Sequence, residues 1–211
     1  MKHLLIIGAR GWGREVYDIA TVCIKAGADL SIKGFLDDKA DALDNYNNYP
    51  PIIGPVETYQ VESDDVFICA LGDVNFKKKY ADIILNKGGE FISLVHPTAI
   101  IGNNAKWGKG CVIGAYANLS SDTSLGDFVT FSIKAGMGHD STIGDYSHIG
   151  GLTNISGFVS IGENVTIHPC CNIVPHRKIG NNSIIGTGSV VLNNVKMGTT
   201  VFGNPAQKID F

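Results

Sequence analysis

The chain has 211 residues, of which 44% are hydrophobic and 18% charged, and its net charge is −3. This composition is typical of a globular protein of one large or two modest domains. It offers no basic field for nucleic acid or an anionic membrane and no apolar stretch long enough to span one, so we expect a cytoplasmic protein in which the lysine run at 77–79 is a solvated helix face.

Residues 1–92 alternate strand and helix patterns. We expect a buried strand at 3–7, a glycine loop at 8–13 and a helix from 14 to about 26. A second strand is expected at 32–36, and a third at 66–71, followed by an amphipathic helix at 75–86. Together these elements predict a small, Rossmann-like parallel α/β sheet.

Glycines and acidic residues gather where these predicted strands end. In parallel α/β sheets, ligands lie beyond the carboxyl ends of the strands, where a helix N-terminus can meet phosphates and an acid can bind hydroxyl groups. Gly11, Gly13, Asp37 and Gly72 all fall there. The spacing from Gly8 differs from the dinucleotide motif G-x-G-x-x-G, and loop glycines often serve only to turn the chain. Nucleotide binding and a plain turn both stay open at this point.

From Ile101 onward, an apolar residue recurs at every sixth position through Met197, and eleven of the seventeen are followed by Gly. A period of six matches neither a helix nor a simple strand, so each hexad is interpreted as a short strand plus a corner, with three hexads in each turn of a triangular prism. The apolar residue fills the axis, the next must allow a close backbone approach, and the fourth after it is small at the corner. The pattern predicts a left-handed parallel β-helix over residues 93–211.

Two details of the hexads lead to separate expectations. Cys111 and Cys171 fall on the small corner position and are expected to pack there. Arg177 occupies the same position, where a local bulge is one interpretation. The five cysteines lack a C-x-x-C spacing, so we expect neither a disulfide framework nor a metal site.

Two histidines point outward from the predicted prism. His139 is the third residue of its hexad, His148 is the sixth, and Asp140 follows His139 directly. Such residues can be ordinary surface groups, or an imidazole can abstract a proton from an attacking amine or hydroxyl with a carboxylate to orient it. Asp140 can reach His139 only if the corner turns between them.

Several motifs, in this order, resemble one family over essentially the whole chain. They are Ile7-Gly8-Ala9-Arg10-Gly11-Trp12-Gly13, Phe35-Leu36-Asp37-Asp38, Leu94-Val95-His96-Pro97, Gly138-His139-Asp140, Gly144-Asp145-Tyr146-Ser147-His148 and Gly203-Asn204-Pro205-Ala206. The chain resembles the bacterial nucleotide-sugar N-acetyltransferases and sialic-acid O-acetyltransferase-like proteins. The resemblance implies a homotrimer of left-handed β-helices that uses acetyl-CoA, with a nucleotide-sugar-binding domain at 1–92.

The resemblance also implies roles for individual residues. His139 would be the general base, Asp140 its acidic partner and His148 a group near the acetyl carbonyl. The nucleotide-sugar site would be lined by Gly11, Trp12, Gly13, Asp37, Asp38, Ala70, Gly72 and Asp73. Coenzyme contacts would come from Gly157, Pro169, Gly186 and Thr187. With a coenzyme bound, the alternative to a bulge at Arg177 is a contact to the coenzyme phosphates. Arg10 and Trp12 stand where family members often carry small residues or a histidine.

Three functions follow as hypotheses. The first is acetyl transfer from acetyl-CoA to the amine of a nucleotide-linked sugar, with a UDP-linked 4-amino-4,6-dideoxy sugar as the usual substrate of the family. The second is O-acetylation of sialic acid or a related sugar, which would use the same base. The third is a non-enzymatic solenoid scaffold with a nucleotide-sensing domain, in which His139 and Asp140 would be incidental.

Overall fold

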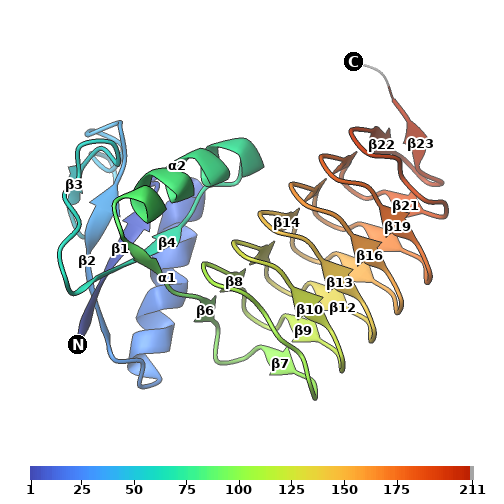
Figure 1. The fold of residues 1–211 in the computed structure, drawn as a ribbon, viewed down its shortest axis with the longest axis horizontal. Coiled ribbons are helices and arrows are strands. Elements are labelled where there is room, and N and C mark those ends of the chain that lie inside the picture. The colour runs from blue at the N-terminus through green and yellow to red at the C-terminus, as the bar shows by residue number, and fades with distance from the viewer. Residues whose placement is uncertain (210–211) are drawn as a thin grey trace. The chain divides into compact units, whose positions relative to one another are not determined.

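The computed structural model describes residues 1–209, which form two compact units (Figure 1). The first unit is Met1–Pro97 and the second begins at Thr98. The sequence placed the boundary between residues 92 and 93. Residues 94–97 fall in the first unit because they pack there, as the Cys23 thiol shows by donating to the Val95 carbonyl oxygen at 3.3 Å.

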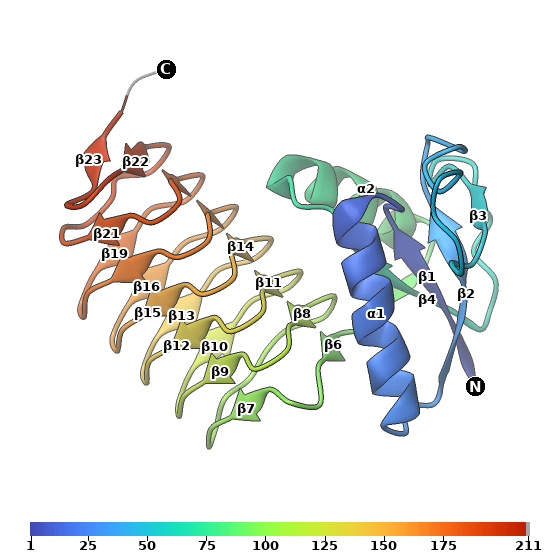
Figure 2. The same cartoon turned by 180° about the vertical axis from the view of Figure 1, so that it is seen from behind.

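Five parallel strands form the sheet of the first unit, in the order β3-β2-β1-β4-β5. They are β1 (Lys2–Ile7), β2 (Leu30–Leu36), β3 (Ile52–Gly54), β4 (Asp65–Cys69) and β5 (Glu90–Phe91), and the short strand β6 (Leu94–Val95) follows. Helices α1 (Gly11–Lys25) and α2 (Val74–Asn86) lie on opposite faces of this sheet (Figures 1 and 2). The three expected strands and both helices are confirmed, and β3 and β5 are short strands at the two edges that the sequence did not reveal.

Two local predictions in this unit are wrong. The glycine loop ends at Arg10, because α1 begins at Gly11 and the Arg14 amide donates to the Arg10 carbonyl oxygen at 3.0 Å. The lysine run is not a uniformly solvated face either, since Lys77 is only 1% exposed. Lys77 lies three residues after Val74 and four before Ala81, so the helical period places it on the buried side of α2.

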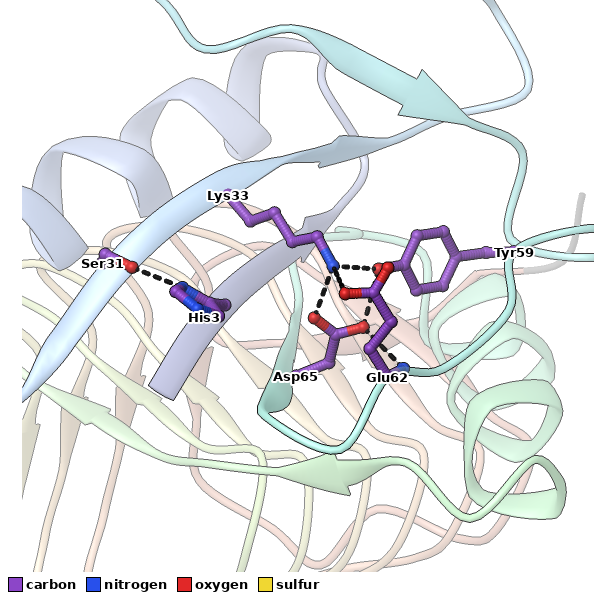
Figure 3. Close-up of polar contacts among 6 residues, drawn as sticks. All are labelled: His3, Ser31, Lys33, Tyr59, Glu62 and Asp65. Carbon is purple, nitrogen blue, oxygen red and sulfur yellow. Dashed lines mark hydrogen bonds and ion pairs between the residues drawn. The ribbon is translucent and has the colours of Figure 1, made fainter. Parts of the chain in front are cut away.

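A polar cluster fastens the segment between β3 and β4 at the sheet end opposite the carboxyl ends of the strands (Figure 3). The Lys33 ammonium donates to the carboxylates of Asp65 at 2.8 Å and Glu62 at 2.9 Å, and the Tyr59 hydroxyl donates to Asp65 at 2.6 Å. The Asp65 side chain is completely buried. The Lys87 ammonium binds the same segment from outside it, because it donates to the carbonyl oxygens of residues 56, 57 and 59. These contacts fix the backbone that carries Val56.

The second unit is a stack of triangular coils with three faces, and the strands within each face pair in parallel except for the last strand of the chain, which is antiparallel to its neighbour (Figure 1). Residues 18 apart pair, as Thr130 does with Val112 and His148. One face holds β7 (Ile100–Ile101), β9 (Asn118–Leu119), β12 (Gly136–Met137), β15 (Asn154–Ile155), β18 (Asn172–Ile173) and β21 (Val190–Val191). A second holds β10 (Ser124–Leu125), β13 (Thr142–Ile143), β16 (Ser160–Ile161) and β19 (Lys178–Ile179). The third includes β8 (Val112–Ile113), β11 (Thr130–Phe131), β14 (His148–Ile149), β17 (Thr166–Ile167), β20 (Ile184–Ile185), β22 (Thr200–Phe202) and β23 (Gln207–Lys208).

The first hexad positions from Ile113 through Val191 fill the axis, and each is nearly fully buried. The prediction fails at the two ends, where Ile101 is exposed and Met197 is 71% exposed. Val195 replaces Met197 on the axis and pairs with Ile179. The last coil is therefore two residues shorter than the period of 18.

The corners of the prism form three columns of residues with left-handed backbone angles. The Asp140 corner contains Asn104, Asp122, Asp140, Phe158 and His176; the Tyr146 corner contains Gly110, Phe128, Tyr146, Asn164 and Asn182; the Cys170 corner contains Tyr116, Lys134, Leu152, Cys170 and Gly188. Cys111 and Cys171 are fully buried beside their corners, as expected. Arg177 causes no bulge, because the next strand keeps its register with Ser160 opposite Lys178.

The model confirms the predicted fold class: a small α/β domain is followed by a parallel β-helix of hexapeptide repeats. Within residues 1–209, none of the helices has the length and apolar character needed to cross a membrane.

Candidate functional site

A pocket of about 430 Å³ lies at the carboxyl ends of the strands of the first unit. This volume lies in the range of pockets that hold small ligands and cofactors. Seven of the eight residues expected to bind a nucleotide sugar line it: Trp12, Gly13, Asp37, Asp38, Ala70, Gly72 and Asp73. Gly11, the eighth, is exposed at the first position of α1 and does not line the pocket. The structure thus gathers residues from three separate loops, as the strand order predicts.

The glycines around this pocket differ in what they do for the fold. Gly8 has a φ of +99°, and a Cβ on Gly13 would lie 2.0 Å from the Gly8 carbonyl oxygen, so both are required for the chain itself. Gly11 and Gly72 have open space where a side chain would be, and neither has a left-handed φ. The fold therefore explains the first two glycines, and of the other two only Gly72 lines the pocket, where it leaves the rim uncrowded.

The acidic residues of the pocket also have structural partners. The Asp37 carboxylate accepts from the amides of Ala9 and Lys39, both at 2.9 Å, which joins the ends of β1 and β2. Asp73 caps α2 by accepting from its first amides. The Tyr80 hydroxyl donates to Asp38, and this hydrogen bond, with burial second, raises the pKa of Tyr80. Each carboxylate oxygen can accept more than one hydrogen bond, so the acids can still take ligand hydroxyl or N–H groups.

The N-terminus of α1 lies at this pocket, and the acids of the pocket come from other segments than the helix itself. Arg10 is the N-cap residue, and its side chain makes no capping hydrogen bond. The first turn of the helix contains no acid, and Arg10 itself lines the pocket. A 15-residue helix presents partial positive charge and backbone N–H groups at this end, and together with the arginine it favours an anion such as a phosphate.

The second site is the Asp140 corner, where His139 and Asp140 form a pair. The His139 Nδ1 lies 2.7 Å from the Asp140 Oδ2, and the two side chains are 59% and 46% exposed. Asp140 has a φ of +55°, so the corner does turn between the two residues as the sequence reasoning required. A carboxylate only accepts hydrogen bonds, so in the neutral imidazole Nδ1 carries the proton and Nε2 keeps its lone pair. An exposed imidazole in this state can accept a proton from a substrate.

The neighbouring coil leaves space for Nε2. A Cβ on Gly157 would lie 2.9 Å from the His139 Nε2, and the three nearest atoms to it all belong to the His139 ring. The Phe158 ring stands perpendicular to the His139 imidazole, with the two ring centroids 5.0 Å apart. The Phe158 ring also stacks on the ring of His176. The base therefore lies against glycine on one side and an aromatic ring on another.

The other expected catalytic and coenzyme residues lie elsewhere on the β-helix. His148 begins β14, on the face that follows the Tyr146 corner. Pro169 and Thr187 lie beside the Cys170 corner, where the Thr187 hydroxyl donates to the Pro169 carbonyl oxygen at 2.9 Å. Gly186 directly precedes Thr187 in the chain, and its carbonyl oxygen accepts from the Cys171 thiol at 3.1 Å. Of the expected catalytic and coenzyme residues, only Asp140 and Gly157 lie next to His139 within the described part of one chain. The roles of all these residues stay predictions.

Sequence reasoning missed several residues of both sites. Phe76 and Tyr80 line the pocket and lie four residues apart on α2, so a helical projection could have placed them together. Val56 and Leu71 carry no comparable signal. At the Asp140 corner, Phe158 and His176 were identifiable by adding 18 to the number of Asp140 and then 18 again. Among residues 1–209, no three His, Cys, Asp or Glu side chains are grouped so as to hold a metal ion.

Comparison with known proteins places these two sites in context. Residues 3–84 match the family described as PglD N-terminal domain, and residues 158–193 match bacterial transferase hexapeptide repeats. The chain is 30% identical over 119 residues to UDP-N-acetylbacillosamine N-acetyltransferase of Bacillus subtilis, and 30% identical over 143 residues to GDP-perosamine N-acetyltransferase of Escherichia coli O157:H7. These alignments cover 54% and 67% of this chain and 52% and 64% of the relatives, so the chain spans between half and two thirds of their length.

A solved structure extends the similarity over both units. The acetyltransferase domain of PglB from Neisseria gonorrhoeae, in complex with acetyl coenzyme A, is 26% identical, with a TM-score of 0.87 over 99% of each chain. An α/β domain with a ligand-sized pocket, followed by a β-helix of hexapeptide repeats, defines a two-domain hexapeptide-repeat protein. Within that class, the chain is similar to the PglD-like nucleotide-sugar N-acetyltransferases.

Proposed function

We propose that this chain transfers the acetyl group of acetyl-CoA to the amino group of a nucleotide-linked amino sugar. The observation that carries the proposal is the exposed His139–Asp140 pair, in which the hydrogen bond at Nδ1 leaves Nε2 as the base. The names of both curated relatives support an N-acetyltransferase acting on such a sugar, and the solved relative with acetyl coenzyme A supports the donor.

The proposed reaction is a direct transfer. The sugar amine attacks the thioester carbonyl carbon, a C–N bond forms, and the C–S bond breaks as the tetrahedral intermediate collapses. His139 Nε2 takes the proton from the nitrogen and passes it to the departing CoA sulfur, while Asp140 stabilises the imidazolium. His148 is proposed as a donor to the developing oxyanion. This sequence of steps needs neither a metal ion nor an acyl-enzyme.

The pocket of the first unit is proposed to hold the nucleotide part of the acceptor. Its α1 N-terminus and Arg10 suit a diphosphate, and its carboxylates suit hydroxyl or N–H groups of the ribose, base or sugar. We take a UDP-linked 4-amino-4,6-dideoxy hexose as the leading acceptor and its GDP-linked counterpart as the competitor, because the two curated relatives are named for one nucleotide each.

A homotrimer is part of the proposal. The Cys170 corner exposes the apolar side chains of Tyr116 and Leu152, and Ile133 is exposed beside it. Lys134 lies between Tyr116 and Leu152 on this corner, but a row made largely of exposed apolar side chains favours association with another protein surface. The row supports a trimer in which each β-helix covers this edge of another.

The test measures release of CoA thiol from acetyl-CoA with UDP-, dTDP- and GDP-linked 4-amino-6-deoxy sugars, and with the matching 4-hydroxy sugars. We expect one amino sugar to be acetylated and its hydroxy counterpart to be inert. His139→Gln should lose about two to four orders of magnitude in kcat, the usual share of a general base. Both proteins should sediment as trimers, since the His139 side chain is exposed.

The outcomes separate the three functions. A rate only with hydroxy sugars would replace the proposal with O-acetylation. A His139→Gln variant with an unchanged rate would refute the assigned base. If acetyl-CoA fails to raise the melting temperature and no sugar reacts, the scaffold function gains support, because a ligand that binds only the folded state must stabilise it.

A further inference from the structure

The Asp140 corner carries aromatic rings on both coils that follow the base, whereas the stacked rings of the Tyr146 corner, Phe128 and Tyr146, lie on earlier turns of that corner. Phe158 and His176 stack in parallel, with centroids 4.9 Å apart and an interplanar angle of 6°. The Phe158 ring then meets the His139 ring at 88° and 5.0 Å. Perpendicular and parallel contacts at these distances are the two favourable geometries of aromatic pairs. The three rings thus form a continuous row that ends at the base.

The backbone beneath this row is rigidly joined. The Phe158 amide donates to the His139 carbonyl oxygen at 3.0 Å, and the His176 amide donates to the Gly157 carbonyl oxygen at 3.2 Å. The buried Ser141 hydroxyl donates to the Ser156 carbonyl oxygen and accepts from the Val159 amide, both at 3.0 Å. These bonds fix the coil of residues 156–159 relative to the coil of His139, so the position of the Phe158 ring is set by the fold.

The imidazole itself is held much less firmly. It is 59% exposed, and its one hydrogen bond among those described here is to Asp140, which is itself exposed. A single hydrogen bond at Nδ1 leaves the ring free to swing about that contact. Gly157 offers no side chain to stop it. The Phe158 ring is the group that bounds this rotation on the side of the next coil.

We propose that Phe158 is a positioning residue, which, backed by His176, holds the His139 ring so that Nδ1 faces Asp140 and Nε2 faces the space above Gly157. This inference rests on the proposed function, because it assigns Phe158 a part in aiming the general base. Phe158 acts through His139 and takes no proton itself.

Asparagine is the sharpest replacement for Phe158. Phe158 has a φ of +59°, and asparagine tolerates the left-handed region better than phenylalanine does. Asn164 and Asn182 already occupy equivalent turns of the Tyr146 corner. Phe158→Asn therefore removes the ring and keeps the turn. Tyr146→Asn is the matched control, since Tyr146 also carries an aromatic ring at a left-handed turn, where it stacks on Phe128.

The experiment has one kinetic and one spectroscopic readout. For Phe158→Asn we expect kcat to fall roughly ten- to a hundredfold, the effect of a misaligned catalytic group, with the KM of both substrates within about twofold. Phe158→Tyr should restore most of the rate, and Tyr146→Asn should equal the wild type. The ¹⁵N spectrum of the His139 ring, assigned by its loss in His139→Gln, should change from a single Nδ1–H tautomer to a tautomer mixture in Phe158→Asn alone.

Each alternative result has a definite meaning. Wild-type kcat and an unchanged His139 spectrum in Phe158→Asn would overturn the positioning role. A loss that is mostly in KM would overturn it too, because Phe158 would then be part of the substrate surface. If the wild-type protein acetylates no sugar, the proposed function fails, while the spectrum still decides whether Phe158 orients His139.

Discussion

Gly157→Ala is the substitution whose effect on the proposed base can be worked out most directly. The added Cβ would lie 2.9 Å from His139 Nε2 and 3.0 Å from Cε1. Ordinary contacts begin near 3.5 Å, so the imidazole must move by about half an ångström. Gly157 has no left-handed φ, and the nearest atoms are those of a surface side chain, so alanine itself should fit the backbone.

The size of the effect follows from that displacement. A misplacement of about 1 Å in a catalytic group can cost about a hundredfold, so half of it should cost roughly tenfold in kcat. This corresponds to about 1.4 kcal/mol of transition-state stabilisation. Folding stability should stay within about 1 kcal/mol of the wild type, because replacing glycine by alanine at a permitted backbone angle reduces the entropy of the unfolded chain.

The assay is CoA thiol release at saturating acetyl-CoA and acceptor, with Gly151→Ala as the control. Gly151 is also the third residue of its hexad, and its Cβ would contact only Ile133, at 3.1 Å. Gly151→Ala should therefore keep the full rate. Wild-type kcat in Gly157→Ala would refute the reasoning. A loss confined to the KM of acetyl-CoA would instead favour the coenzyme contact that the family resemblance implies for Gly157.

Two further predictions test Asp140 and Asp65. Asp140→Asn places a residue that tolerates the left-handed turn but removes the charge beside the imidazole. We therefore expect kcat to fall roughly a hundredfold while the melting temperature is unchanged. A kcat loss below threefold across a pH–rate series would contradict this. Burial of Asp65 acts to raise its pKa, but hydrogen bonds from Lys33 and Tyr59 outweigh this and lower it. Asp65→Asn should therefore cost about 2–4 kcal/mol in urea unfolding at pH 7. Because the folded-state pKa lies below the unfolded value, the difference should shrink as the pH falls below about 4, and a constant difference down to pH 2 would argue against the ion pair.

The α/β unit shows where sequence patterns lose information. Alternation of strands and helices predicted three strands and both helices, because burial dictates apolar runs and amphipathic periods. The start of α1 was missed by three residues, since glycine disfavours helices in general but Gly13 is required here by its contact with Gly8. Lys77 was misassigned because a charged residue is rarely buried, although its place in the helical period pointed inward.

Contacts between distant segments of this unit had no signal in the sequence. Tyr80 reaches Asp38 across 42 positions, and Lys33 reaches Asp65 across 32. Such pairs depend on how strands are ordered in the sheet, and the short strands β3 and β5 were not visible as patterns. The pocket could therefore be predicted in its location, at the carboxyl ends of the strands, but only partly in its walls.

The β-helix behaves differently because its period converts sequence number into position. Residues 18 apart lie on adjacent coils, so Gly157 had to be the neighbour of His139, and Phe158 the neighbour of Asp140, before any coordinates were known. The conversion holds only while the period holds, and it fails at Val195, where the coil loses two residues. His139 lies three coils before that break, within the regular part of the stack. The aromatic row beside His139 is thus a consequence of the spacing of Asp140, Phe158 and His176. Inserting or deleting one residue between these positions would separate the rings, although the chain would still contain all of them.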